Sequence, residues 1–257
     1  MNILYFDCSS GISGDMALSA LLDLGIEKDR LVKELKKLPL ESWQIELNTV
    51  SKNGIHVKQL EVILEDPTHY HHYGHTHGHE PEHKHVRRSM EDIERIINIS
   101  GISNHAKLLA KRIFMRLAIA EAKVHNTTPE EIHFHEVGAV DSILDIVGTA
   151  ICMDILSPDK IYASELQDGN GFVECQHGII PVPVPAVVEI LAARNIPLKR
   201  IDIEGEMITP TGAAIIAELA ESFRPMPEME ITKTGYGAGK KLYASLPNFL
   251  KVLQGNI

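Results

Sequence analysis

The chain has 257 residues, 44% of them hydrophobic, which is enough to build a sizeable core in one large or two small domains. Its formal net charge of −10, with histidine counted as neutral, argues against duplex nucleic acid and anionic membrane as main partners. No apolar run in the sequence approaches the roughly 20 residues of a membrane-spanning helix. Three scattered cysteines (Cys8, Cys152 and Cys175), together with a start that lacks the shape of a signal peptide, favour a reducing, cytoplasmic setting.

The first elements expected are a buried strand at residues 2–6, a Gly/Ser-rich loop, and a helix through residues 16–24. This order directs backbone N–H groups and a helix N-terminus at whatever lies above the strand end. The loop lacks the Gly-Lys-Ser/Thr of a Walker motif. Asp7 closes the strand, where its carboxylate can reach a metal or a hydroxyl. The alternative is that Asp7 and Asp15 only cap the turn and the helix.

A second helix is expected at residues 28–38, and a β-hairpin follows it. Residues 43–49 alternate between apolar and polar side chains, Asn53-Gly54 comes next, and residues 55–64 complete the pair. Asn-Gly between two strand-like runs is a strong hairpin signal, because both turn residues tolerate positive φ. The hairpin favours a mixed sheet over a purely parallel one.

A histidine-rich tract occupies residues 67–88. Imidazole suits nickel, zinc and copper, and a tract of this composition is typical of metal binding. Because the tract contains almost nothing apolar, it cannot build a packed core, so we expect a flexible loop inserted after the hairpin. The alternative is a solvated loop that holds no metal. The candidate metal ligands in the tract are His69, His71, His72, His75, His77, His79, His83 and His85.

Two helices are expected next, around residues 93–97 and 106–124, where apolar side chains recur at helical spacing. Residues 128–131, Thr-Pro-Glu-Glu, then predict another helix start. Thr128 would be the N-cap, proline would take the first helical position, and Glu131 would close a capping box.

A second chemical cluster lies at residues 133–145. His133 and His135 point the same way if the segment is extended, and Glu136 adds a carboxylate. Asp141 and Asp145 lie one turn apart on a helix that is apolar nearly all round, and a buried carboxylate pair requires a ligand or hydrogen bonds. The cluster is therefore a candidate site for a divalent ion. The alternative is helix capping and hydrogen-bonded core histidines.

A strand is expected at residues 160–163, an extended proline-rich segment at 181–185, and a helix at 186–194. Between the first two, Cys175 and His177 stand two residues apart. Such a pair can complete a metal or substrate site, although alone it is a weak signal.

Thr209 and Thr211 begin a further helix, where two hydroxyls at the N-terminus make a seat for an oxyanion or phosphate. Plain N-capping, the alternative, requires only one of them. The glycine-rich, basic segment 235–241 precedes a strand expected at 249–253, so it is not a dinucleotide fingerprint. It can cradle a phosphate, or it is a flexible turn.

Strands interleaved with helices, without a detectable repeat, favour an α/β (α+β) fold. We expect a single domain over residues 1–257, with a mixed sheet, flanking helices and the inserted histidine-rich loop.

Several segments together resemble the LarC family, nickel insertion proteins that mature the nickel-pincer cofactor of lactate racemase. Their order and spacing run from the first residues nearly to the last, so the set is specific although no single segment is. The matching segments are 5–16, the histidine-rich tract, 133–143 (HFHEVGAVDSI), 177–183 (HGIIPVP), 209–214 (TPTGAA) and 235–239 (GYGAG).

The resemblance implies an enzyme, a nickel insertion lyase of the metal chelatase type. Family members insert Ni²⁺ into a pyridinium mononucleotide that carries two thiocarboxylates, and they consume CTP with Mg²⁺ or Mn²⁺. The implied partners are this substrate, CTP and a second copy of the chain, with neither nucleic acid nor membrane. Soft thiocarboxylate sulfurs can take nickel from harder nitrogen and oxygen ligands.

The resemblance also suggests roles for particular residues. His133, His135 and Glu136 would form the nickel transfer site, with the histidine-rich tract collecting metal. Asp141 or Asp145 would hold the helper ion or orient a histidine, and His177 or His135 would accept the proton that leaves the ring carbon. Asp7 remains a further metal candidate. The candidate phosphate ligands are Ser9, Ser10, Gly11, Ser13, Gly14, Thr209, Thr211 and Gly212.

Family members continue past the point where this chain stops into a second domain, where we expect much of the CTP binding. This chain then corresponds to the N-terminal part, which would be inactive alone or completed by a separate C-terminal LarC-type chain. Two rival functions remain: a nickel-binding metallochaperone or store without catalysis, and a metal-dependent hydrolase that would release phosphate without the pyridinium substrate.

Overall fold

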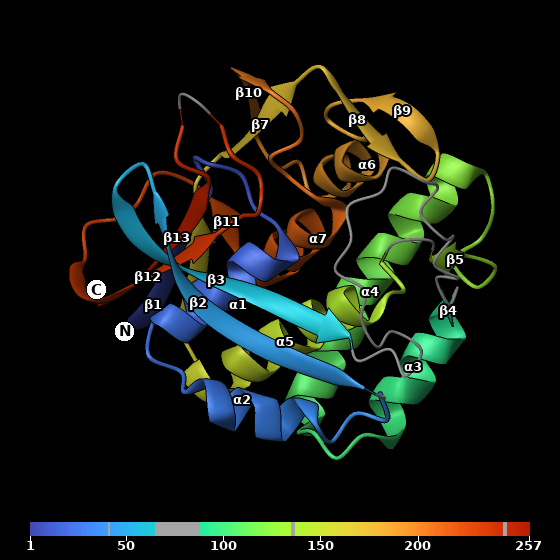
Figure 1. Ribbon diagram of the computed structural model, residues 1–257, viewed down its shortest axis with the longest axis horizontal. Helices are drawn as coiled ribbons and strands as arrows, with labels where there is room; N and C mark the ends of the chain where they lie inside the picture. The colour runs from blue at the N-terminus through green and yellow to red at the C-terminus, as the bar shows by residue number, and fades with distance from the viewer. Residues whose placement is uncertain (41, 65–87, 135–136, 244–245) are drawn as a thin grey trace, which may run out of the picture.

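The fold is given by a computed structural model that describes residues 1–40, 42–64, 88–134, 137–243 and 246–257 (Figure 1). Its main sheet has seven strands in the order β11-β6-β1-β13-β12-β3-β2. The strands are β1 (Asn2–Asp7), β2 (Trp43–Lys52), β3 (Ile55–Leu64), β6 (Lys160–Ala163), β11 (Ser222–Phe223), β12 (Glu230–Ala238) and β13 (Phe249–Asn256).

The sheet is mixed, as the sequence predicted. Strand β1 pairs in parallel with β6 and antiparallel with β13, while β2 and β3 form the antiparallel hairpin. Asn53 and Gly54, with φ of 51° and 83°, make the turn of this hairpin, so its prediction is confirmed. The remaining short strands pair two by two and are β4 (Arg88–Ser89) with β5 (His133–Phe134), β7 (Leu166–Asn170) with β10 (Leu198–Glu204), and β8 (Phe172–Cys175) with β9 (Gly178–Pro181).

Helices flank the sheet and pack on one another (Figure 1). Helix α1 contacts β12, β3 and β13 directly, and α5 and α7 contact α1, while α4 packs against α3, α5, α6 and α7. Buried side chains from Leu4 to Val252 form one continuous cluster between these elements. The helices are α1 (Gly14–Asp23), α2 (Lys28–Leu35), α3 (Met90–Ile99), α4 (Asn104–His125), α5 (Val140–Leu156), α6 (Pro185–Ala193) and α7 (Pro210–Leu219).

Two glycines of β12 allow α1 to approach the sheet closely. A Cβ on Gly237 would lie 2.0 Å from the Met16 carbonyl oxygen, and one on Gly235 would lie 2.1 Å from that of Ala20. The prediction of a flexible turn is therefore wrong for residues 235–238, because these glycines belong to a strand under a helix. Within the segment 235–241, only residues 239–241 lie beyond the end of the strand.

The predicted helix start at residues 128–131 is also wrong. These residues form a turn in which the Glu131 N–H donates to the Thr128 carbonyl and the Glu131 carboxylate accepts from the Thr127 hydroxyl. The carboxylate thus binds to Thr127 and Thr128 within the turn, and the chain continues not into a helix but into β5, which pairs with β4. The helix begins later, at Val140, with Ala139 as its N-cap.

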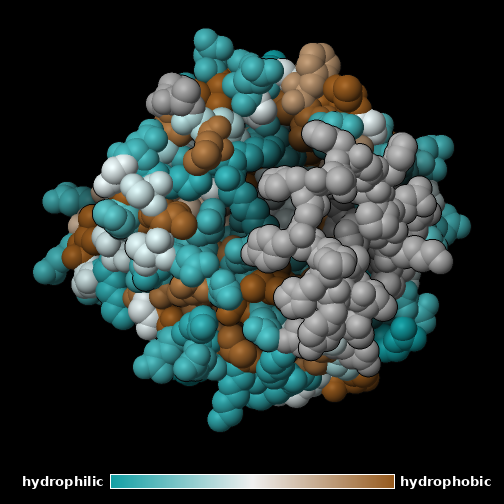
Figure 2. All heavy atoms as spheres, viewed as in Figure 1, coloured by the Kyte–Doolittle hydropathy of each residue, from teal (hydrophilic) through white to brown (hydrophobic). Residues whose placement is uncertain are grey.

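On the face shown in Figure 2, hydrophilic residues cover most of the described surface, and hydrophobic residues form small groups. Within the described ranges, no helix combines the length and the apolar character that crossing a bilayer requires.

Candidate functional site

A cavity of about 660 Å³ lies where several helix ends and loops meet. Its wall is formed by the N-terminal turns of α1, α5, α6 and α7, the last turn of α4, strand β5, the β8–β9 hairpin and the loop after β12. A cavity of this size is within the range of small-molecule sites. These contributions come from residues 13 to 248, so only the folded chain assembles the site.

Three carboxylates lie on one side of the cavity. Asp141 and Asp145 share one face of α5, as their spacing predicted, and Asp15 comes from the first turn of α1. The Oδ1 atom of Asp145 is buried and has no hydrogen-bond partner among the described residues. Burial raises the pKa of Asp145 well above its ordinary value, and the charges of Asp15 and Asp141 raise it further against the opposing charge of Lys240. A carboxyl group in this setting keeps its proton to a higher pH than usual. It can also bind a cation that prefers oxygen ligands.

The N-termini of α1 and α7 are held side by side by a backbone contact. The Ile12 N–H donates to the Met207 carbonyl at 3.0 Å, and the Thr209 N–H donates to the Ile12 carbonyl at 3.1 Å. A Cβ on Gly212 would lie 2.3 Å from the same Ile12 oxygen, so glycine permits the contact. Two helix N-termini that meet in one cavity favour an anionic group between them.

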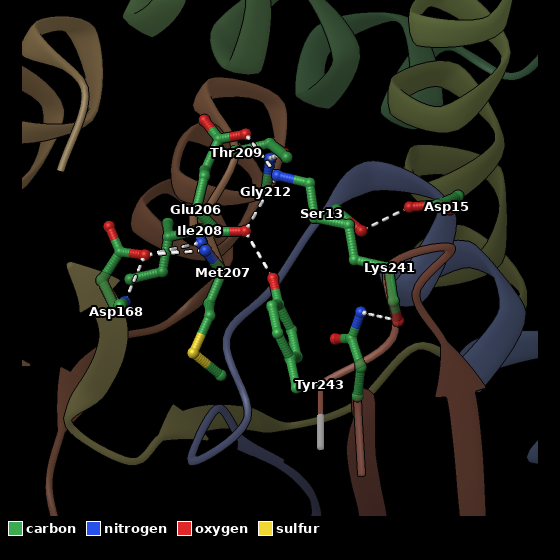
Figure 3. A network of polar contacts seen from close by, with 12 residues as sticks. Ser13, Asp15, Asp168, Glu206, Met207, Ile208, Thr209, Gly212, Lys241 and Tyr243 are labelled. Atoms are coloured by element: carbon green, nitrogen blue, oxygen red, sulfur yellow. Dashed lines mark hydrogen bonds and ion pairs between the residues drawn. The ribbon is translucent and has the colours of Figure 1, made fainter. Parts of the chain in front are cut away.

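Asp168 fixes the position of the backbone segment that leads into α7. Its side chain is fully buried, and its Oδ1 accepts hydrogen bonds from the N–H groups of Gly169, Met207 and Ile208 at 2.9, 2.8 and 3.2 Å (Figure 3). Burial raises the pKa of Asp168, although these three hydrogen bonds act in the opposite direction. The segment that carries Thr209 into the cavity is thus fixed to β7.

The loop after β12 brings basic and hydroxyl groups to the same region. The Tyr243 hydroxyl donates to the Glu206 carbonyl at 2.8 Å, and the Lys241 ammonium donates to the same oxygen at 3.2 Å (Figure 3). Burial and the nearby charges of Glu206 and Asp168 raise the pKa of Tyr243 to about 12, so its hydroxyl is protonated at neutral pH. Lys240 lines the cavity with an exposed side chain, and its charge acts on Asp145.

Histidine and cysteine side chains lie at another part of the wall. The Cys175 Sγ and His177 Nδ1 atoms are 3.9 Å apart at the β8–β9 turn. The His177 ring packs on the His125 ring with centroids 4.9 Å apart, and the His125 Nε2 lies 3.5 Å from a carboxylate oxygen of Glu121. His133, on β5, also lines the cavity.

Many of the predicted site residues meet in this cavity, while others do not. Asp7 forms an ion pair with Lys251 at 2.7 Å and does not line the cavity. Burial alone would raise the pKa of Asp7, but the hydrogen bonds from Lys251 and Ser9 bring it below its ordinary value. The predicted residues that line the cavity are Ser13, Gly14, His133, Asp141, Asp145, His177, Thr209 and Thr211, and those that do not are Asp7, Ser9, Ser10, Gly11 and Gly212.

His135, Glu136 and the eight histidines of the tract lie outside the described residues. Within the described part of the chain, no three His, Cys, Asp or Glu side chains are grouped closely enough to hold a metal ion. The Thr209 hydroxyl accepts from the Gly212 N–H, so it is an N-cap as the plainer alternative proposed. The Ser13 hydroxyl likewise caps α1, accepting from the Met16 N–H and contacting the Asp15 carboxylate, while Thr211 lines the cavity.

Sequence reasoning did not identify several residues of the site. Glu121 and His125 stand at i and i+4 on α4, a spacing that places both on one helix face. This spacing was the available signal. Asp168, Glu206 and Tyr243 offered none, because each lies alone in an ordinary stretch of sequence.

Comparison with known proteins identifies the family. The model of the family described as "Nickel insertion protein" matches residues 4–256. A curated relative from Acetivibrio thermocellus is 50% identical over 256 residues, covering 100% of this chain and 61% of the relative. Relatives from Clostridium kluyveri and Clostridium acetobutylicum are 47% and 48% identical over 260 and 272 residues, covering 99% of this chain and 62% and 64% of their own lengths.

All three relatives carry the name pyridinium-3,5-bisthiocarboxylic acid mononucleotide nickel insertion protein. The chain spans about three fifths of the first of them, 61% of its length. No solved structure matches the chain. The order of the matching segments and the extent of these matches show that the chain belongs to the nickel insertion protein family.

Proposed function

We propose that this chain inserts nickel into pyridinium-3,5-bisthiocarboxylic acid mononucleotide, as a lyase of the metal chelatase type that depends on CTP with Mg²⁺ or Mn²⁺. The observation that carries the proposal is that one cavity brings together two helix N-termini, carboxylates and histidine side chains. The relatives that match the whole chain are named for the same substrate, which supports this assignment. Nickel is a substrate of the reaction.

The phosphate of the mononucleotide fits between the N-termini of α1 and α7. Two helix dipoles point their positive ends at this place, and Lys240 adds a full positive charge beside it. Ser13, Thr209 and Thr211 are the hydroxyl-bearing residues at the two termini that line the cavity. The pyridinium ring then extends along the wall toward His133 and His177.

The carboxylates suit the helper ion. Mg²⁺ and Mn²⁺ prefer oxygen ligands, and the unpartnered Oδ1 of Asp145 is an acceptor that such an ion would satisfy. Asp141 and Asp15 supply further oxygens on the same side of the cavity. When bound, the ion would neutralise phosphate charge. The chain's own part would be to supply these oxygens to the ion from one side of the cavity.

Nickel transfer requires donors that bind the ion and then release it. Imidazole is such a donor, and thiocarboxylate sulfur is softer, so nickel passes from His133 to the substrate. His135 and Glu136 are proposed as additional ligands. When nickel bonds to the ring carbon, a C–H bond breaks and its proton moves to a base, for which His177 or His135 is proposed.

The partners proposed with this function are the pyridinium substrate, CTP, a second copy of the chain and a separate chain of the C-terminal LarC type. A cytoplasmic setting is proposed as well, since Cys8, Cys152 and Cys175 are all free thiols.

Substitution of His133 tests the proposal. His133 is exposed on a two-residue strand, so His133→Ala is expected to lower nickel insertion about 10- to 100-fold while the unfolding transition stays unchanged. The measurement is nickel incorporated into the mononucleotide in the presence of CTP and Mg²⁺. His105→Ala is the matched control, because His105 pairs with Asp154 away from the cavity. Full insertion by His133→Ala would exclude His133 as a nickel donor, and no insertion by the unsubstituted chain, assayed both alone and with a C-terminal LarC-type chain, would exclude the proposed function.

The second candidate function is a nickel carrier or store without catalysis. The histidine-rich tract at residues 67–88 favours it, because such tracts bind metal without a catalytic geometry. A carrier would lose its capacity on deletion of residues 68–85, whereas an insertion enzyme supplied with ample nickel would keep its activity.

A further inference from the structure

The β8–β9 hairpin carries a thiol and an imidazole at the cavity wall. Cys175 ends β8, His177 lies in the turn, and Gly178, with φ of 85°, opens β9. The Cys175 Sγ lies 3.9 Å from the His177 Nδ1, and both residues line the cavity. The other two cysteines, Cys8 and Cys152, are fully buried in the core. Cys175 is therefore the thiol that a solute in the cavity can reach.

The pair is supported by residues of a different element. The His125 ring, from the last turn of α4, packs against the His177 ring with an interplanar angle of 34°. Glu121 stands one turn earlier, with its Oε2 3.5 Å from the His125 Nε2. This contact chain restricts where the His177 ring can lie relative to the cavity.

The spacing and chemistry of the pair suit one nickel ion. Sulfur and nitrogen ligands of first-row divalent metals lie about 2.3 and 2.0 Å from the metal, so two atoms on one ion are at most about 4.3 Å apart. The observed separation of 3.9 Å lies within this limit. Thiolate and imidazole are both donors that nickel accepts, and thiolate is softer than any nitrogen or carboxylate donor in the cavity wall.

We propose that nickel on its way from His133 to the substrate is held by the Cys175 Sγ and the His177 Nδ1 together at the moment of handover. This inference rests on the proposed function and deepens it. Two protein donors leave coordination positions open, and the two thiocarboxylate sulfurs can enter there before the protein donors leave. His125 is a positioning residue in this scheme, because it acts on nickel through the His177 ring.

The bonds and charges balance without an oxidant or a reductant. As nickel binds, the Cys175 thiol gives its proton to solvent and a nickel–sulfur bond forms. At handover the nickel–Cys175 and nickel–His177 bonds break, and two nickel–thiocarboxylate bonds form while nickel remains Ni²⁺. The released Cys175 thiolate regains a proton from solvent. The nitrogen lone pair released on His177 is then available for the proton that leaves the ring carbon.

Absorption spectroscopy with nickel alone tests the proposal on the full chain. A nickel–thiolate bond gives charge-transfer absorption in the near ultraviolet, which imidazole and carboxylate ligands lack. The histidine-rich tract contains no cysteine, so nickel bound there does not contribute. Titration with Ni²⁺ is expected to produce this absorption. Cys175→Ser should abolish it and His177→Ala should weaken nickel binding at this site at least about tenfold.

The controls separate this site from the rest of the protein. Cys175→Ser leaves Cys8 and Cys152 in place, and His105→Ala removes a histidine outside the cavity, so it should leave the absorption unchanged. Absence of the absorption in the unsubstituted chain, or its persistence in Cys175→Ser, would overturn the proposal. Since no substrate is present, these outcomes do not depend on whether the chain inserts nickel. If the absorption forms but survives addition of the mononucleotide and CTP, Cys175 is a nickel ligand but not the handover site.

Discussion

Asp145→Asn is expected to lower nickel insertion about 10- to 100-fold and, at neutral pH, to stabilise the fold by about 1 kcal/mol. Asp145 has a buried oxygen without a partner and stands beside Asp15 and Asp141, so its charged form is costly in the folded chain. An amide of the same shape removes that charge but is a poor ligand for a hard cation. A substitution that lowers activity but raises stability is expected at a functional residue whose charged form destabilises the fold.

The pH dependence has a definite sign. The pKa of Asp145 is raised in the folded chain, so above the ordinary carboxyl value the native state holds a proton that the unfolded chain has lost. The corresponding contribution to stability is fully present in acid, and it is lost as the pH rises toward the folded-state pKa. The Asp145→Asn variant has no carboxyl group here, so its stability does not fall in this way. The difference in unfolding free energy between the variant and the unsubstituted chain should therefore grow as the pH rises above about 4.

Thermal or urea unfolding at several pH values measures this effect alongside the insertion assay. Asp29→Asn is a matched control, since Asp29 is an exposed residue on α2 that lies outside the cavity; it should change stability by less than about 0.5 kcal/mol. Full insertion by Asp145→Asn, or a stability difference that shrinks as the pH rises, would contradict the role given to Asp145.

Asp168→Ala is expected to lower the free energy of unfolding by about 3 kcal/mol or more, the opposite of the effect at Asp145. Its Oδ1 accepts from three backbone N–H groups in a fully buried place, and alanine would leave all three without that acceptor. The segment from Met207 to Thr209 would lose its attachment to β7. We therefore also expect weaker binding of the mononucleotide.

Asp168→Asn separates the hydrogen bonds from the charge. The amide keeps one oxygen that can accept from the Met207 and Ile208 N–H groups, so it should lose less stability than alanine does. Chemical denaturation of the two variants gives the comparison, and calorimetry gives the affinity for the mononucleotide. If Asp168→Ala were as stable as the unsubstituted chain, the carboxylate would not be what holds this loop.

Local patterns in the sequence predicted local structure well. Asn53-Gly54 predicted the hairpin because positive φ is a property of those two residues, and the i, i+4 spacing placed Asp141 and Asp145 on one face of α5. Strand pairing and glycine packing depend on distant partners. Gly235 and Gly237 were interpreted as part of a phosphate cradle or a flexible turn, because the sequence does not show that α1 lies on them.

The parts of the site that escaped prediction are formed by long-range contacts. Asp168 meets Met207 across 39 residues of sequence, and His177 meets His125 from another element. Neither contact leaves a spacing that can be found in the sequence. Residue types did indicate where the cavity lies, since several of the carboxylates, histidines and helix N-termini named from the sequence line it.

The most direct test of the account is transfer of nickel from the chain to the pyridinium mononucleotide, measured on the full chain and on a variant lacking residues 68–85. Calorimetry follows nickel binding, and mass spectrometry of the mononucleotide follows the product, with CTP and Mg²⁺ present. The account predicts that the deletion variant keeps one nickel site in the cavity and transfers its nickel when the metal is in excess. If nickel binding and transfer both vanish with residues 68–85, the cavity is not the site of insertion.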